Sequence, residues 1–197
     1  MLHSDGWQVL KNAVCVSPQA RRALRLQLRG AHAIFNYNEQ SEANDHLRTQ
    51  ARLRPKKNAD IAAFCSSVSG AVPFLGRRAC REWVVIRSEA GCQRQHRHRD
   101  FDPAAVCGLA DDDIPLAVIV GLDSDAKLVV WPTCIRGKTP AADDPGTIIT
   151  FGTGDVVVFR GDLVHAGAAY PEKCNVRVHS YVDAPGVKRK NDRTYLC

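Results

Sequence analysis

The sequence is 197 residues long and has an ordinary globular composition, with 45% hydrophobic and 24% charged residues. This length predicts a single domain that folds without disulfides or a structural metal, and the composition argues against wholesale disorder. No apolar run approaches the ~18 residues of a membrane helix. The first residues also lack the basic-then-apolar plan of a signal peptide. We therefore expect a soluble, intracellular protein of the cytoplasm or nucleus, with no membrane partner.

The net charge of +6 is unevenly distributed along the chain. Residues 1–100 carry 17 Lys and Arg against 8 Asp and Glu, whereas residues 101–197 carry 10 against 13. A basic half favours an anionic partner, such as a nucleic acid, a phosphorylated metabolite or an acidic protein. A solvated basic helical face accounts for the same charge equally well.

The eight cysteines contain no CxxC pair and no compact disulfide framework. Several of them, such as Cys65 and Cys107, stand in apolar stretches, where a free thiol behaves as a small hydrophobic side chain. The pattern predicts reduced thiols in a reducing compartment.

The first eighty residues predict helices. Ser17 and Pro18 form a typical helix start before a segment rich in Ala, Leu, Arg and Gln, which predicts a helix over 19–29 that ends at Gly30. Apolar residues at helical spacing predict another over 58–69. Further helices are expected over 41–52 and from Pro73 to 81.

After residue 82 the pattern changes to short runs rich in Val and Ile, which predict strands. These runs are 83–87, 116–122, 127–131, 147–151, 155–160 and 175–183. Tight connections at 123–125 and 152–154 predict hairpins. The plan is a mainly β, α+β single domain over 1–197, with a helical buttress (1–82), a β-sandwich or barrel core (83–183) and a C-terminal tail (184–197).

The candidate chemistry lies at the start of the β region. Side chains alternate faces in an extended chain, so His98 and Asp100 share one face and together can chelate a cation. His165, which follows the strand 155–160 and a turn, is the candidate third ligand. Two histidines and one carboxylate form the facial triad of non-haem Fe(II) oxygenases.

Arg177 lies in the middle of the predicted strand 175–183, among alternating apolar residues. A buried arginine needs an anionic partner, and its planar fork suits a carboxylate. A dicarboxylate cosubstrate that chelates the metal at one end could meet Arg177 at the other.

The pattern His98-x-Asp100, then His165, then Arg177 resembles the 2-oxoglutarate/Fe(II)-dependent dioxygenases, over roughly residues 83–183. The resemblance implies a double-stranded β-helix, or jelly roll. It implies that His98, Asp100 and His165 bind Fe(II), and that Arg177 binds the distal carboxylate of 2-oxoglutarate. With O2, the expected reaction is hydroxylation or oxidative demethylation of a substrate. His179 stands where many members have Ser, and either lines the cosubstrate pocket or packs in the barrel.

The substrate is not encoded in a readable motif. Arg97 and Arg99 are predicted to face away from the metal, and at the rim of the pocket they would favour an anionic substrate. AlkB-type nucleic-acid demethylases carry a second Arg at the position of Asp183, so a nucleic-acid partner has no motif to support it. The sequence does not indicate an oligomeric state.

Two alternatives remain open. His96-x-His98 with Asp102 also resembles the first cupin motif, in which case His96, His98 and His165 would bind the metal of a dioxygenase that does not use 2-oxoglutarate. The second alternative is a non-catalytic jelly-roll binding module.

Overall fold

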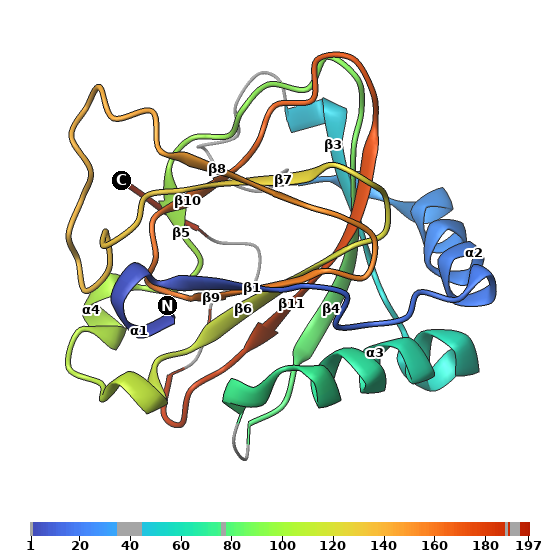
Figure 1. The fold of residues 1–197 in the computed structure, drawn as a ribbon, viewed down its shortest axis with the longest axis horizontal. Helices are drawn as coiled ribbons and strands as arrows, with labels where there is room; N and C mark the ends of the chain where they lie inside the picture. Colours follow the sequence, from blue (N-terminus) through green and yellow to red (C-terminus); the bar gives the residue numbers. More distant parts are fainter. Residues whose placement is uncertain (1, 35–44, 76–77, 188, 190–193) are drawn as a thin grey trace.

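The computed structural model describes residues 2–34, 45–75, 78–187, 189 and 194–197. Two antiparallel sheets face each other and form the body of the molecule (Figure 1). The larger sheet has the strand order β1-β9-β6-β11-β4-β3-β2, and the smaller one β12-β5-β10-β7-β8. The larger sheet comprises β1 (Trp7–Leu10), β2 (His32–Ala33), β3 (Arg48–Arg52), β4 (Arg81–Ser88), β6 (Leu116–Gly121), β9 (Val156–Arg160) and β11 (Asn175–Val182). The smaller comprises β5 (His98–Arg99), β7 (Ala126–Val130), β8 (Thr147–Phe151), β10 (His165–Gly167) and β12 (Tyr195–Leu196).

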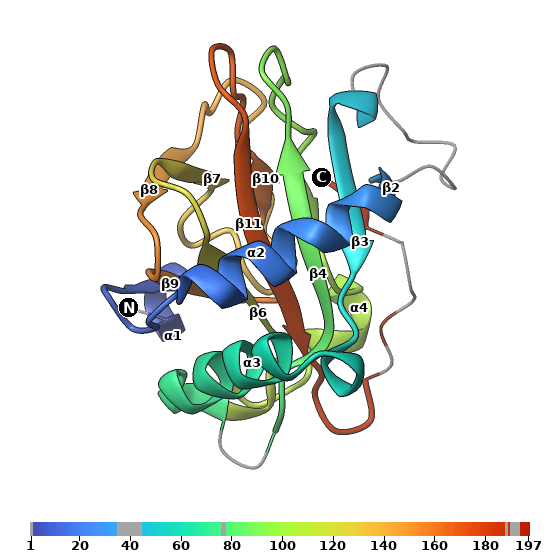
Figure 2. The same cartoon turned by 90° about the vertical axis from the view of Figure 1, so that its right-hand side faces the viewer.

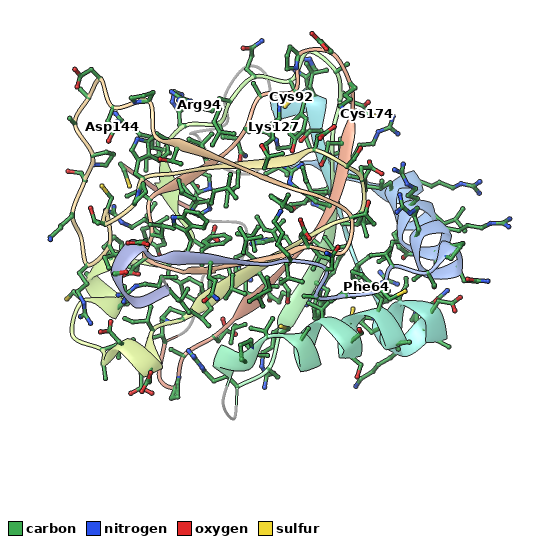
Figure 3. The ribbon with its side chains drawn as sticks, in the orientation of Figure 1. Phe64, Cys92, Arg94, Lys127, Asp144 and Cys174 are labelled. Atoms are coloured by element: carbon green, nitrogen blue, oxygen red, sulfur yellow. The ribbon has the colours of Figure 1, made fainter. Side chains whose placement is uncertain are left out.

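Two helices cover the outer face of the larger sheet (Figure 2). Ser17 caps α2 (Pro18–Gln27) by accepting from the Ala20 amide, and Asn58 caps α3 (Ala59–Ala71) by accepting from the Ile61 amide. Figure 3 shows Phe64 on the sheet side of α3, where it is buried. Burying one such side chain contributes about 1.5–3 kcal/mol. The helices predicted over 19–29 and 58–69 are thus confirmed, with boundaries shifted by up to two residues. Short helices elsewhere are α1 (Leu2–Asp5), α4 (Pro103–Val106) and the 3-10 turns η1 (Leu28–Gly30), η2 (Asp45–Leu47), η3 (Pro55–Lys57), η4 (Pro73–Leu75) and η5 (Asp111–Asp113).

Strands β6 and β9 are buried along their whole length because both of their faces are covered. Val118 and Val158 pack in the outer cluster with the helices, whereas Ile119 and Phe159 pack between the sheets. The side chains of strand β11 also alternate between these two faces of the larger sheet. Val176 and Val178 face the helices, so the intervening Arg177 and His179 face the interior between the sheets.

The prediction that the first eighty residues are helical is only partly correct. Strand β3 (Arg48–Arg52) pairs with β4 inside the predicted helix 41–52, whose residues 41–44 lie outside the described residues. Arg, Gln and Ala are good helix formers, but pairing with a neighbouring strand overrides this weak preference. Strand β1 likewise pairs with β9 at the edge of the sheet. After Pro73 the structure has a single 3-10 turn, and 76–77 lie outside the described residues.

The predicted hairpins at 123–125 and 152–154 are wrong. Strand β6 lies in the larger sheet and β7 in the smaller, so residues 123–125 carry the chain from one sheet to the other. Residues 152–154 return it from β8 to β9. The chain passes closely here, since a Cβ on Gly121 would lie 2.2 Å from the Gly152 carbonyl oxygen. At both of these connections the chain therefore crosses from one sheet to the other, as in a jelly roll.

The observed architecture confirms the predicted fold class, a double-stranded β-helix with helices on one side. Strand β12 pairs with β5, so the chain beyond residue 183 contributes to the smaller sheet as well. The division of a single domain at residues 82 and 183 stays a prediction. All eight cysteines lie in the described part of the chain, and none forms a disulfide. In that part of the chain, no helix combines the length and the apolar character that crossing a membrane requires.

Candidate metal and cosubstrate site

His98, Asp100 and His165 converge between the two sheets. Strands β5 and β10 are antiparallel neighbours, and His98 and His165 are direct partners in their register. Asp100 lies two residues after His98 and therefore on the same face. One ligand atom from each of the three lies within 4.8 Å of the others, and all three side chains are buried. This convergence is what the spacing in the sequence predicted.

Both imidazoles are oriented by backbone carbonyls. His98 Nδ1 is 2.8 Å from the His96 carbonyl oxygen, and His165 Nδ1 is 3.0 Å from that of Leu163. An acceptor at each Nδ1 assigns the proton to that nitrogen and leaves the lone pair on Nε2. His165 Nε2 lies 3.7 Å from Asp100 Oδ1. Metal-ligating histidines are commonly fixed by such a hydrogen bond on the other ring nitrogen.

The carboxylate of Asp100 is buried without the hydrogen bonds that such a group normally needs. Burial raises the pKa of Asp100 to about 6, an effect that the nearby His98 partly offsets. Burial also lowers the pKa of both His98 and His165 to about 4. At neutral pH the site therefore holds one anionic carboxylate and two neutral imidazoles. No described residue forms a hydrogen bond with Asp100 Oδ2. A buried charge of this kind is costly unless it is paired or coordinates a metal, and two imidazoles with one carboxylate suit iron.

Arg177 enters the same cavity from β11. Its Nη1 donates to the hydroxyl of Ser88 on β4 at 3.0 Å, and its guanidinium lies 5.6 Å from the centre of the Tyr170 ring. Arg177 is 4% exposed, and no carboxylate forms an ion pair with it in the described part of the chain. A buried cation without an anionic partner is expensive. The site therefore offers a place for an anionic group from a ligand.

A single cavity connects these groups. His179 also faces it, and burial lowers the pKa of His179 to about 3, so this imidazole is neutral as well. The remaining lining combines apolar side chains with a few polar ones, as is usual for small-molecule sites. The lining residues are Ile34, Arg48, Gln50, Ile86, Gln95, His98, Asp100, Ile119, Leu128, Phe159, His165, Gly167, Arg177, His179 and Tyr181.

The sequence reasoning missed Arg48 and Ser88. Arg48, on β3, is 1% exposed and donates through Nε to Ser88 Oγ at 3.2 Å. Its Nη2 donates to the carbonyl oxygens of Gln93 and Ala168. Arg48 therefore links the segment that precedes His98 to the segment that follows His165. Ser88 was detectable as the residue just after the predicted strand 83–87. Arg48 was hidden inside a predicted helix.

The structure does not support the predicted roles of the residues around the triad. His96 is exposed and is absent from both the triad and the cavity lining, and Asp102 caps α4 by accepting from the Ala104 amide. The cupin-type set is therefore not brought together. Arg97 and Arg99 do not line the cavity. Arg97 donates to the Ala141 carbonyl oxygen, and Arg99 to those of Lys138 and Asp162. Both arginines hold the 131–146 connection instead, so the expectation that they form a basic rim is wrong.

No known family model matches the sequence, and no curated protein matches it. Solved structures do match the fold. The epimerase SnoN, in complex with Fe3+, alpha ketoglutarate and nogalamycin RO, superposes with a TM-score of 0.65 at 11% identity, over 97% of this chain and 84% of that one. HygX from Streptomyces hygroscopicus, with nickel and 2-oxoglutarate bound, gives 0.66 at 10% identity, over 95% and 86%. A Pseudomonas putida prolyl-4-hydroxylase gives 0.58 at 15% identity, over 93% and 95%. The resemblance inferred from the sequence is thus confirmed at the level of the fold, which this chain shares with these enzymes.

Proposed function

We propose that the protein is an Fe(II)- and 2-oxoglutarate-dependent oxygenase that acts on a small molecule. The observation that carries the proposal is the presence of two features in one buried cavity. One is a His-Asp-His group in which a backbone carbonyl accepts at each histidine Nδ1, and the other is a buried arginine without a carboxylate partner among the described residues. Hydroxylation or oxidative demethylation is the proposed outcome.

His98, Asp100 and His165 would hold the metal. A metal bound there would supply the activation of O2, which would oxidise both 2-oxoglutarate, to succinate and CO2, and a substrate C–H bond. The protein's own contribution would be these three ligand atoms, a number that leaves positions on an octahedral ion open to other ligands. The buried surroundings also exclude bulk water from the reacting groups.

Arg177 would bind the distal carboxylate of 2-oxoglutarate. A guanidinium and a carboxylate form two parallel charge-assisted hydrogen bonds, which fix both the position and the direction of the cosubstrate. Ser88 accepts a hydrogen bond from Nη1 and so holds the fork in place. The structures of SnoN and HygX, which contain a metal and 2-oxoglutarate on this fold, support this assignment.

The same comparisons support the proposed substrate class. SnoN has been solved with nogalamycin RO and HygX with hygromycin B, and both are small molecules. The same fold hosts an epimerase and a carbocyclase, so the fold alone does not select the reaction. We extend only the small-molecule class to this protein, and an anionic substrate stays a prediction from the basic half of the sequence.

The direct test is anaerobic titration of the purified protein with Fe(II) and then with 2-oxoglutarate. We expect the weak visible charge-transfer band of the 2-oxo acid chelated to Fe(II), and on admission of air we expect succinate from 2-oxoglutarate. A folded protein that binds Fe(II) but gives no band and no succinate would contradict the cosubstrate assignment. A folded protein that binds no metal would favour the binding-module alternative.

A further inference from the structure

His179 is a buried histidine to which the proposed function gives no defined task. It lies two residues after Arg177 on β11, so both side chains face the same cavity. Two aromatic rings hold its imidazole. Phe159 stacks on it with ring centres 6.4 Å apart and planes at 15°, and Tyr181 meets it edge-on at 4.4 Å. Packing of this kind fixes the direction in which the ring nitrogens point.

The imidazole is directed at the Asp100 carboxylate. His179 Nε2 lies 3.8 Å from Asp100 Oδ2, the oxygen with which no described residue forms a hydrogen bond. The other oxygen, Oδ1, faces His165 Nε2 within the triad. The separation of 3.8 Å is longer than a hydrogen bond. A hydrogen bond would require these two atoms to move closer together.

The two oxygens of Asp100 therefore face different neighbours. Carboxylates that bind metals are usually hydrogen-bonded through their remaining oxygen, and this second contact fixes how they approach the ion. A neutral imidazole has one N–H, and the anionic Oδ2 favours its location on Nε2. His179 Nε2 thus faces the oxygen that needs a donor.

We propose that His179 is a positioning residue that orients Asp100 by donating from Nε2 toward Oδ2, so that Oδ1 is presented to the metal. This inference rests on the proposed function, because it requires the triad to bind a metal. It assigns His179 to the metal side of the cavity, whereas the sequence placed it either beside the cosubstrate or in the packing of the barrel.

Metal binding by the apo protein tests the proposal without any turnover. Ni2+ affinity is measured by isothermal titration calorimetry for wild type, His179→Phe and His179→Gln, and the visible spectrum is recorded with Co2+. The Phe variant keeps an aromatic ring between Phe159 and Tyr181 but has no donor, whereas the Gln amide restores one. His96→Gln is the matched control, because His96 is exposed and lies outside the cavity. Thermal unfolding verifies that each variant is folded.

We expect His179→Phe to bind Ni2+ about 10- to 100-fold more weakly, the usual effect of removing such a partner. His179→Gln should recover most of the affinity, and the Co2+ spectrum should keep its band positions because the ligand set is unchanged. Equal Ni2+ affinity in wild type and His179→Phe would overturn the positioning role alone. Weak binding in both variants, with shifted Co2+ bands, would also overturn it and would make His179 a ligand. A wild-type protein that binds neither ion would instead overturn the proposed function, and this inference with it.

Discussion

Arg177 on β11 donates a hydrogen bond to the hydroxyl of Ser88 on β4, and Arg48 donates to the same oxygen from the opposite strand. One serine hydroxyl thus accepts hydrogen bonds from two buried guanidinium groups, both of which line the cavity. This relationship determines what mutations at the cosubstrate end should do.

Ser88→Ala should weaken 2-oxoglutarate binding about tenfold, because Arg177 loses the acceptor that holds its fork. This corresponds to the ~1.5 kcal/mol that a hydrogen bond to a charged group contributes. Arg177→Ala should have a larger effect, since the carboxylate then loses its charged partner. Calorimetric titration of the Ni2+-loaded protein with 2-oxoglutarate measures both. Ser180→Ala is the control, because the Ser180 hydroxyl bonds the Arg81 carbonyl oxygen on the outer side of the sheet. An equal loss in Ser180→Ala would show that Ser88 acts only through stability.

Replacing any one member of the triad by Ala should abolish 2-oxoglutarate turnover and greatly weaken metal binding. Each of His98, Asp100 and His165 offers one of the three proposed ligand atoms, and two ligands would hold a divalent ion poorly. Succinate release and metal content after dialysis are the measurements. His96→Ala should behave as wild type in both. Loss of metal in His96→Ala with retention in Asp100→Ala would restore the cupin-type alternative.

Gly167→Ala should destabilise the protein by about 1–3 kcal/mol, the usual cost of forcing an extra group into a packed site. A Cβ at this position would lie 2.4 Å from Gln95 Oε1 and 3.2 Å from Arg48 Cζ. Gln95 Oε1 accepts a hydrogen bond from the Gly167 amide, and this bond links the segment before His98 to β10. The added methyl group would disrupt it.

The matched comparison is Gly70→Ala, where a Cβ meets nothing within 4 Å in the helix α3. That change should stabilise the protein by about 0.5–1 kcal/mol, because Ala favours a helix interior over Gly. Midpoints of urea or thermal unfolding measure both variants, and a destabilised Gly70→Ala would contradict the reasoning.

Thiol labelling of the native protein should separate the cysteines by burial. Burial raises the pKa of Cys65 to about 12, so its thiol stays protonated and unreactive at pH 8. Cys15, Cys107 and Cys174 are exposed and should react first with iodoacetamide, as read by peptide mass spectrometry. Cys65 should react only after denaturation. Because its folded pKa exceeds the unfolded value of 9.0, this group also predicts a loss of stability as pH rises from about 9 to 12.

The site was more predictable than its surroundings, for a physical reason. His98 and Asp100 need only strand alternation to share a face, and Arg177 stands out as a charge inside an apolar strand. Local periodicity carries both signals. Arg48 could not be found in this way, because its segment favours a helix locally and becomes strand β3 only through pairing with β4.

The hairpin predictions were wrong for a related reason. The turn residues at 123–125 and 152–154 were recognised, but a turn does not specify whether the next strand pairs with the previous one or crosses to the other sheet. That choice depends on the burial of both faces of β6 and β9 by distant elements. The orientation of Asp100 Oδ2 toward His179 is equally invisible in the sequence, since it requires β5 and β11 to be placed in opposite sheets.

The short strand β5 carries His98 and is held between β10 and β12. Two residues cannot form a stable strand by themselves, so this part of the site exists only after segments far apart in sequence have come together. Proteins dominated by such non-local contacts tend to fold slowly. An ion that binds only the assembled site would then raise the free energy of unfolding through linkage, by about 2.7 kcal/mol at a hundredfold excess over its Kd. Metal binding and folding would thus be coupled, and the metal-free protein would have the lower free energy of unfolding.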